Sequence, residues 1–329
     1  MSRIGIPDID LALETRLLAS MQEVEVFLRE AIEGKYPLVI ETSRHLIDAG
    51  GKRLRPLLTL LASHFGNPEA DGLIEAAVVC ELTHLGTLYH DDVMDEAPLR
   101  RGVESANNRW DNSVAILTGD YLFAKTSQLL ADLGPEAVRL QALTFERLVI
   151  GQITETQGSS QGKTQLEHYL NVVSDKTASL ISASARYGAL ISGAEPIVID
   201  ALTNFGEEIG VVFQLADDII DIVSDSHESG KTPGTDLREG VPTLVTLFIL
   251  ESEDPNDAKL KELLCAPITD EAVVQETILK LRSHIALTKS RELVAERAKS
   301  AQMHLSLLPE GPAKAALVGL SQAVISRTS

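Results

Sequence analysis

The chain has 329 residues, of which 44% are hydrophobic and 23% are charged, and its formal net charge is −19. This hydrophobic content excludes a disordered chain and allows a large buried core. The acidic surface excludes nucleic acid as a partner, and a polyanionic substrate would need a local basic patch or a bound metal.

The cysteines and the N-terminus predict a cytoplasmic protein. Cys80 and Cys265 both lie among apolar residues, which indicates buried free thiols in a reducing compartment. Residues 1–18 lack the basic start and the apolar run of a signal peptide. No run of about 18 apolar residues occurs, so no stable membrane insertion is expected.

Apolar residues recur at three- and four-residue spacing along nearly the whole chain, which predicts an all-α fold. The aromatic content of 4% disfavours strands. Prolines divide the chain into about ten to thirteen helices, at Pro7, Pro37, Pro68, Pro135, Pro196 and Pro312. The polar stretches 98–108 and 225–240 are predicted to be loops. No flexible linker interrupts the chain, so a single domain over residues 1–329 is expected.

The first motif in chain order is basic and spans residues 50–56, with the sequence GGKRLRP. It sets Lys52, Arg53 and Arg55 beside two glycines. Arginine pairs two phosphate oxygens at once, and glycine lets a backbone come close to a phosphate. This segment is therefore a candidate anion-binding site.

Two clusters of aspartates repeat one spacing, i, i+1 and i+4: Asp91, Asp92 and Asp95, then Asp217, Asp218 and Asp221. On a helix the three carboxylates of each cluster fall within an arc of about 100°. A single cluster could be a solvated helix face or a helix end. Two identical clusters in mostly apolar helices favour magnesium, which joins carboxylates to phosphate oxygens. The sequence therefore predicts a diphosphate held between the clusters by bridging metals.

Further cations accompany these clusters. Arg100 and Arg101 follow the first cluster, Lys176 opens a helix of small residues, and Lys231 stands 14 residues (231 − 217) after Asp217. Each alone would be read as an ordinary surface cation. Their joint placement in so acidic a chain favours diphosphate binding.

Together these segments resemble the trans-type polyprenyl diphosphate synthases, and most of all the long-chain octaprenyl- and nonaprenyl-forming members. The matching stretches run in the family's order: GGKRLRP (50–56), LYHDDVMDEAPLRRG (88–102), GDYLFA (119–124), DKTASL (175–180), FQLADDIID (213–221) and GKTPGTDLREG (230–240). The resemblance covers residues from about 40 to 245. It implies an isoprenoid synthase helical bundle around a central active-site cavity.

The resemblance also implies roles for the aspartates and lysines. Magnesium ligands are expected at Asp91, Asp92, Asp95, Asp217 and Asp221. Asp218, Lys176 and Lys231 complete the expected catalytic set. The family uses about three magnesium ions per site, and manganese is expected to be able to replace them.

Two diphosphate subsites follow from the same resemblance. Arg100, Lys176 and Lys231 are expected to contact the allylic diphosphate, and isopentenyl diphosphate is expected at Lys52, Arg55, His84 and Arg101. Thr177 and Gln214 resemble residues that direct oxygen dipoles at a carbocation. Glu155 matches an acidic position near the metals, although a plain surface glutamate is the alternative. Val241 departs from the family, since many members carry a lysine there.

In this family, bulky residues four or five positions before the first aspartate stop chain growth early. Gly86 and Thr87 occupy these positions and are small, so an open tunnel and a product of about C35 to C50, the size of a quinone side chain, are expected. A replacement of either residue by Phe is expected to shorten the product. The floor of the tunnel is expected to come from another helix, around Phe123.

The expected function is thus magnesium-dependent condensation of isopentenyl diphosphate onto an allylic diphosphate by a homodimer. The product could be handed to a membrane. Alternatives are a geranylgeranyl or farnesyl diphosphate synthase, a non-catalytic subunit of a heteromeric synthase, and a class I terpene cyclase. Cyclases lack the GGKRLRP segment, and non-catalytic subunits usually lose aspartates that this chain retains.

Overall fold

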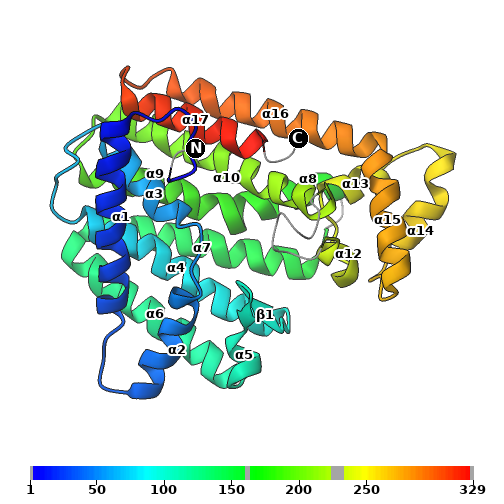
Figure 1. Ribbon diagram of the computed structural model, residues 1–329, viewed down its shortest axis with the longest axis horizontal. Helices are drawn as coiled ribbons and strands as arrows, with labels where there is room; N and C mark the ends of the chain where they lie inside the picture. Colours follow the sequence, from blue (N-terminus) through cyan, green and yellow to red (C-terminus); the bar gives the residue numbers. More distant parts are fainter. Residues whose placement is uncertain (1–2, 160–163, 224–232, 327–329) are drawn as a thin grey trace. The chain divides into compact units, whose positions relative to one another are not determined.

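The computed structural model describes residues 3–159, 164–223 and 233–326, and Figure 1 shows the order of their elements. Almost all regular structure in these ranges is helical, which confirms the all-α prediction. Within the same ranges, no helix combines the length and the apolar character needed to cross a membrane.

The chain divides into two compact units, and α7, α10 and α17 contribute to both. The first unit takes the described residues of 1–146, 180–206 and 307–317, and the second those of 147–179, 207–306 and 318–329. The single domain over residues 1–329 stays a prediction.

The elements of the first unit are mostly long helices. They are α1 (Leu11–Ala31), α2 (Pro37–Asp48), α3 (Leu54–Ser63), α4 (Leu73–Met94), β1 (Leu99–Arg100), β2 (Val103–Glu104), α5 (Ala106–Arg109), α6 (Asn112–Leu133), nearly all of α9 (Ser179–Ile191), and the first parts of α7 (Pro135–Gln157), α10 (Pro196–Val223) and α17 (Pro312–Ser326).

The second unit holds the later parts of α7, α10 and α17, together with several short helices. Its own elements are α8 (Gln165–Val173), the π-helix η1 (Ser174–Ala178), α12 (Thr235–Glu239), α13 (Leu244–Leu250), the 3₁₀ helix η2 (Pro255–Asp257), α14 (Ala258–Leu264), α15 (Glu271–Ser283) and α16 (Ile285–Leu305).

The described residues contain more helices than the ten to thirteen predicted, because short helices form in stretches without clear periodicity. Helix α12 lies within 225–240, and 98–108 holds a small hairpin and most of α5, so the loop prediction was wrong at these elements. Residues 225–232 lie outside the described residues. In the hairpin, Arg101 (φ 54°) and Gly102 (φ 78°) form the two-residue turn between β1 and β2. Two positive φ angles are the mark of a type I′ turn.

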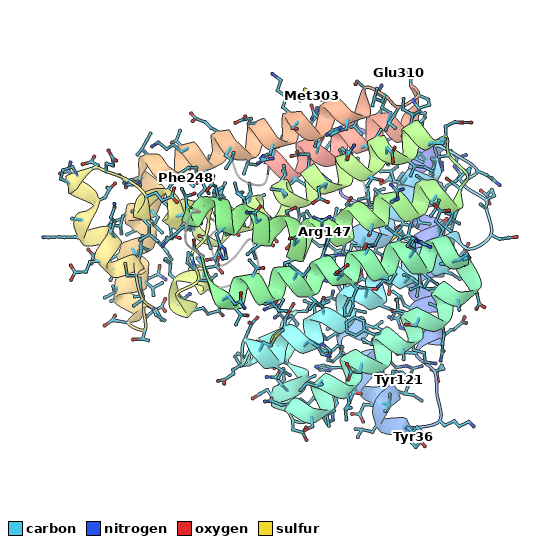
Figure 2. The ribbon with its side chains drawn as sticks, turned by 180° about the vertical axis from the view of Figure 1, so that it is seen from behind. Tyr36, Tyr121, Arg147, Phe248, Met303 and Glu310 are labelled. Carbon is cyan, nitrogen blue, oxygen red and sulfur yellow. The ribbon has the colours of Figure 1, made fainter. Side chains whose placement is uncertain are left out.

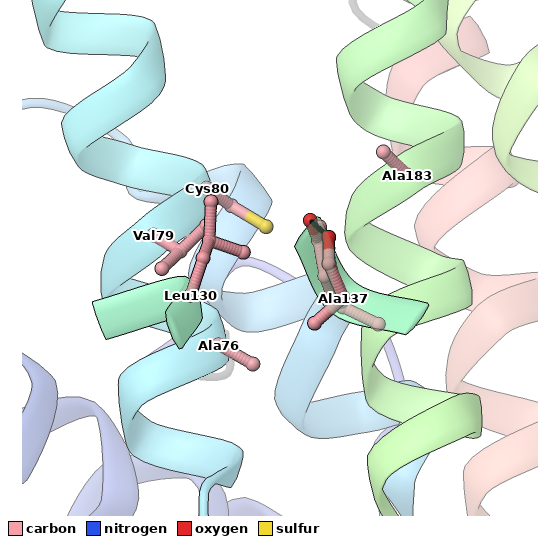
Figure 3. Packing of buried hydrophobic residues seen from close by; sticks show 7 residues of the cluster. Ala76, Val79, Cys80, Leu130, Ala137 and Ala183 are labelled. Carbon is pink, nitrogen blue, oxygen red and sulfur yellow. Dashed lines mark hydrogen bonds between the residues drawn. The ribbon is translucent and has the colours of Figure 1, made fainter. Parts of the chain in front are cut away.

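Helix α4 is the centre of the first unit and packs against α1, α3 and α6. Figure 3 shows part of this core, where the buried Cys80 lies near Leu130 and Ala137. Gly119 of α6 has no side chain, which lets α4 approach closely. A Cβ at this position would lie 2.4 Å from the His90 Nε2. Cys80 is buried as predicted, but Cys265 is exposed, because it ends the short surface helix α14.

Candidate active site

The first aspartate cluster lies at the C-terminal end of α4. Asp91 is half-buried and Asp95 is exposed, whereas Asp92 is completely buried. The Asp92 Oδ1 accepts a hydrogen bond from the Arg100 Nε at 2.6 Å, and its buried Oδ2 has no hydrogen-bond partner among the described residues. Burial raises the pKa of Asp92, and Arg100 opposes this. A buried carboxylate oxygen without a donor is suited to a cation, so the cluster fits a metal.

The second cluster lies near the end of α10, and its middle aspartate is also the most buried. Asp218 accepts hydrogen bonds from the Tyr169 hydroxyl, the Gln214 side-chain amide (3.1 Å) and the Leu244 backbone N–H (3.1 Å). Burial raises the pKa of Asp218 to about 6. Asp218 thus anchors α8 and α13 to α10. Its predicted catalytic role stays a prediction.

The outer aspartates of this cluster are more accessible. Asp217 and Asp221 are both half-buried. The carboxylate of Asp221 accepts from the backbone N–H groups of Thr235 (3.2 Å) and Asp236 (3.4 Å) and so caps the start of α12. Asp221 therefore holds the start of α12 against α10, in addition to its predicted role as a metal ligand.

The two clusters belong to different units, Asp91–Asp95 to the first and Asp217–Asp221 to the second. Their predicted meeting across a diphosphate therefore stays a prediction. Across residues 3–159, 164–223 and 233–326, no group of three or more His, Cys, Asp or Glu side chains is arranged to hold a metal ion. Magnesium sites commonly use only one or two carboxylates and complete their shell with water and phosphate oxygens.

Basic side chains gather around His84 of α4 in the first unit. Burial lowers the pKa of His84 well below its ordinary value, and Arg55, Arg101, Arg100 and Arg53 lower it further. Burial also lowers the pKa of Arg55, whose buried Nε has no hydrogen-bond partner in the described part of the chain. Glu81 balances part of this charge, since it pairs with Arg53 and Arg101. An anionic ligand would balance the rest.

Arg101 reaches this basic cluster from the hairpin turn. Its Nη1 donates to the carbonyl oxygens of Leu46 (2.9 Å) and Gly50. A Cβ on Gly51 would lie 2.9 Å from the Arg101 Cζ. The Arg101 guanidinium thus lies against Gly51, and the close approach of a phosphate to these glycines stays a prediction. Lys52, from the same motif, is exposed.

Lys176 and Thr177 lie in the π-helix η1, between α8 and α9. Single turns of this kind often occur at functional sites. The Lys176 Nζ lies 2.5 Å from the Glu155 carboxylate, and the Thr177 hydroxyl donates to the Gln214 Oε1 at 3.3 Å. Within the second unit, the structure thus brings together four of the residues that the sequence singled out.

Arg147 of α7 holds this π-helix in place and was not predicted from the sequence (Figure 2). Its guanidinium binds Asp175 in η1 at 2.9 Å and Glu207 of α10 at 2.6 Å. These two ion pairs raise the pKa of Arg147 above its already high value, against the effect of burial. Spacing along the chain carries no sign of this network, since its members are 28 and 60 residues away from Arg147.

We expect Arg147→Met to lower the Tm by about 4 to 8 °C and kcat by about tenfold, because Asp175 and Glu207 would lose their shared partner and η1 its support. Arg186→Met is the matched control, since Arg186 pairs with Asp200 at similar exposure but outside η1. Thermal unfolding and steady-state kinetics measure both effects. Equal effects of the two variants on kcat would contradict the proposed support of η1.

The space directly beside Gly86 is filled by a ring of α6, and the open tunnel stays a prediction. A Cβ on Gly86 would lie 2.8 Å from the Phe123 ring of α6. That ring also packs against Phe145, with centroids 4.7 Å apart, and against His90 at 5.5 Å. The Thr87 hydroxyl turns back to the His84 carbonyl at 2.8 Å. The small residue on α4 is thus matched by a large one on α6.

Lys231, which was predicted to contact the allylic diphosphate, lies outside the described residues. Val241, the departure from the family, is exposed. Tyr89 is fully buried, as expected for a core residue, and its hydroxyl donates to the Thr42 carbonyl at 2.5 Å.

An all-α chain with two aspartate clusters and a cluster of half-buried arginines has the features of a helical, diphosphate-binding enzyme. The family model for polyprenyl synthetase matches residues 36–281. The chain is 45% identical to nonaprenyl diphosphate synthase of Mycobacterium tuberculosis, covering 98% of this chain and 97% of that one. It is 41% identical to dimethylallyltranstransferase of the same organism, covering 87% of each.

The fold is also similar to that of a relative with a solved structure. A crystal structure of geranylgeranyl pyrophosphate synthase from Corynebacterium glutamicum, complexed with calcium and isoprenyl diphosphate, has a TM-score of 0.87. The sequence identity is 43%, and 97% of this chain and 98% of that one are covered. The chain therefore belongs to the polyprenyl synthetase family of prenyltransferases and has its all-α isoprenoid synthase fold, which confirms the resemblance seen in the sequence.

Proposed function

We propose that this prenyltransferase condenses isopentenyl diphosphate with an allylic diphosphate in a magnesium-dependent reaction. The observation that carries the proposal is the cluster of Arg55, His84 and Arg101, which concentrates positive charge in a chain of net charge −19. A basic cluster of this kind binds a polyanion with little competition from the rest of the surface.

The proposed residue roles follow from this chemistry. Magnesium held by Asp91, Asp92, Asp95, Asp217 and Asp221 would offset the charge that develops on the leaving diphosphate. Arg100, Lys176 and Lys231 bind the same group. Lys52, Arg55, His84 and Arg101 hold isopentenyl diphosphate, and Thr177 and Gln214 direct oxygen atoms toward the cationic carbon.

The reaction balances without another reactant. The allylic C–O bond breaks, and its electron pair leaves with the diphosphate. The double bond of isopentenyl diphosphate then forms the new C–C bond, and loss of one proton to the released diphosphate restores an alkene. Exclusion of water protects the cation during these steps.

The test is an incubation of the purified protein with farnesyl diphosphate, labelled isopentenyl diphosphate and magnesium, followed by sizing of the products. Label in a longer allylic product supports the proposal, and no incorporation contradicts it. Incorporation only after addition of a second protein would favour the heteromeric alternative.

We propose a product of about C35 to C50, with geranylgeranyl or farnesyl diphosphate as the alternative. The 45% identity to a nonaprenyl synthase supports the long product. Since Phe123 occupies the space beside Gly86, we assign to Phe123 this part of the boundary, which was expected around Phe123 from the sequence.

We expect Phe123→Ala to lengthen the product by at least one isoprene unit, because it removes a ring where the growing chain would extend. Thr87→Phe should shorten the product to about C15–C20 by filling the adjacent space. Chromatographic sizing measures both. Leu129→Ala, a smaller change farther along α6, is the control and should leave product length unchanged. Unchanged length in Phe123→Ala would remove Phe123 from the boundary, and a wild-type product of only C20 would refute the long-chain proposal.

We further propose a cytoplasmic homodimer. Exposed apolar side chains on α6 and α7 support self-association, namely Ile116, Leu117, Val138 and Leu143, of which Leu117 is 66% exposed. The free thiol of the exposed Cys265 suits a reducing compartment.

A further inference from the structure

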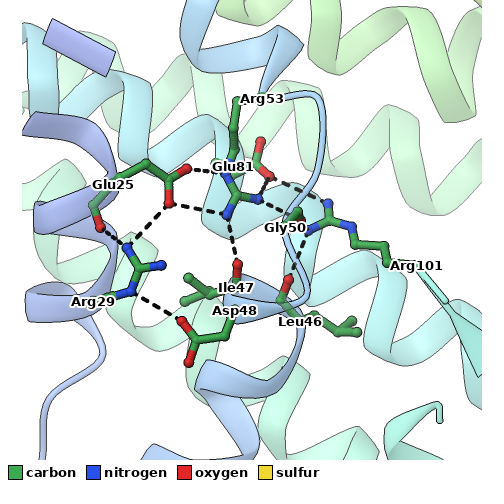
Figure 4. Close-up of polar contacts among 9 residues, drawn as sticks. All are labelled: Glu25, Arg29, Leu46, Ile47, Asp48, Gly50, Arg53, Glu81 and Arg101. Carbon is green, nitrogen blue, oxygen red and sulfur yellow. Dashed lines mark hydrogen bonds and ion pairs between the residues drawn. The ribbon is translucent and has the colours of Figure 1, made fainter. Parts of the chain in front are cut away.

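Glu81 lies on α4 one turn before His84 and is buried, with its side chain 2% exposed. Its Oε1 lies 2.9 Å from the Arg53 Nη1 and 3.5 Å from the Arg101 Nη2 (Figure 4). One carboxylate thus joins the GGKRLRP segment to the hairpin turn. A buried carboxylate is costly unless paired, and here it has two cationic partners.

Both partners of Glu81 have an unusual backbone. Arg53 (φ 47°) and Arg101 (φ 54°) are two of only four non-glycine residues with positive φ in the described part of the chain. Such residues are strained and persist where the surroundings determine their position, often near functional sites. The ion pairs with Glu81 hold both arginines in these backbone conformations.

The same two arginines cap the C-terminal end of α2. Arg53 donates to the Ile47 carbonyl at 2.9 Å, and Arg101 donates to the Leu46 carbonyl at 2.9 Å. These carbonyls belong to the last turn of α2, whose oxygens have no partner within the helix. The position of Arg101 is therefore fixed by Glu81, by α2 and by the Gly50 carbonyl.

We infer that Glu81 is a positioning residue for the isopentenyl diphosphate subsite, which it organises by holding Arg101 and Arg53 in their strained conformations. The inference rests on the proposed function, in which Arg101 binds that diphosphate. Glu81 touches no substrate in this role and acts through Arg101.

Glu25 provides a matched control. It binds the other side of Arg53, with 2.5 Å between the Arg53 Nε and the Glu25 Oε1, and the contacts of Arg101 do not include it. Burial by itself would lower the pKa of Arg53, but Glu25 and Glu81 together raise it. Loss of either glutamate removes an ion pair of Arg53. Only the loss of Glu81 also removes an ion pair of Arg101.

The test compares Glu81→Gln with Glu25→Gln. Glu81→Gln should raise KM for isopentenyl diphosphate by about tenfold to a hundredfold and leave KM for the allylic substrate and kcat within about threefold. Glu25→Gln should lower the Tm but leave KM for isopentenyl diphosphate within about threefold. In an Arg101→Ala background, Glu81→Gln should add no further rise, because the residue through which it acts is gone.

Calorimetric titration with inorganic diphosphate separates this inference from the proposed function, since it needs no elongation. A tenfold weaker Kd in Glu81→Gln, with an unchanged Kd in Glu25→Gln, supports the inference even if no product forms. If Glu81→Gln does not fold, Glu81→Asp keeps the charge but withdraws the carboxylate, and about threefold to tenfold weaker binding is expected. Equal Kd values in all variants, additive effects with Arg101→Ala, or no binding by the wild type would overturn the inference.

Discussion

Asp91→Ala or Asp217→Ala should lower turnover by about 10³-fold or more. Each change removes an accessible carboxylate from a predicted metal site, so the charge on the leaving diphosphate would be poorly balanced. Steady-state kinetics with a magnesium titration measures the effect, and EDTA should abolish the wild-type activity. Asp132→Ala, a change at an exposed aspartate of α6, is the control and should behave as wild type.

The buried middle aspartate of the second cluster should respond differently. Asp218→Asn should lower the Tm, because Asp218 accepts hydrogen bonds from Tyr169, Gln214 and Leu244. The magnesium concentration for half-maximal activity should change more in Asp217→Asn than in Asp218→Asn. Near-normal turnover in EDTA, or in either alanine variant, would refute the metal-dependent mechanism.

Arg55→Met should raise KM for isopentenyl diphosphate by about a hundredfold and leave the allylic KM nearly unchanged. The Arg55 Nε is buried without a hydrogen-bond partner among the described residues, and burial lowers the pKa of Arg55 although Glu81 opposes this. An anion would relieve both penalties, so much of its binding energy should depend on Arg55.

The same reasoning predicts a gain in stability without ligand. Removal of a half-buried cation whose Nε makes no hydrogen bond to the described residues should keep or raise the Tm of the free protein, while saturating diphosphate should stabilise the wild type more than Arg55→Met. Lys231→Ala is the complementary variant and should chiefly raise the allylic KM. Equal effects of both variants on the two substrates would show that the subsites are misassigned.

The helical fold and the binding motifs could be predicted because both are local properties. A period of three to four residues determines which face of a helix is buried, and the spacing of Asp91, Asp92 and Asp95 places them on one side of α4. The family resemblance then linked the motifs to diphosphate chemistry. The family comparison supports that link over most of the chain.

Contacts between distant segments could not be predicted in this way. Asp92 and Asp218 share the spacing of their neighbours, but they are buried because Arg100 and Tyr169 lie against them. The hairpin turn of Arg101 was also missed, since only Gly102 carries a turn signal. Sequence spacing shows which residues share a helix face but not which residue of another element covers it.

The contact between Gly86 and Phe123 constrains how this chain could evolve a different product. A larger residue at position 86 would meet the Phe123 ring at 2.8 Å, so it would be tolerated only after position 123 had become smaller or the ring had turned aside. The two positions should therefore change together among relatives, with their combined volume nearly conserved. A laboratory lineage selected for shorter products should accordingly acquire changes at position 87 before any at position 86.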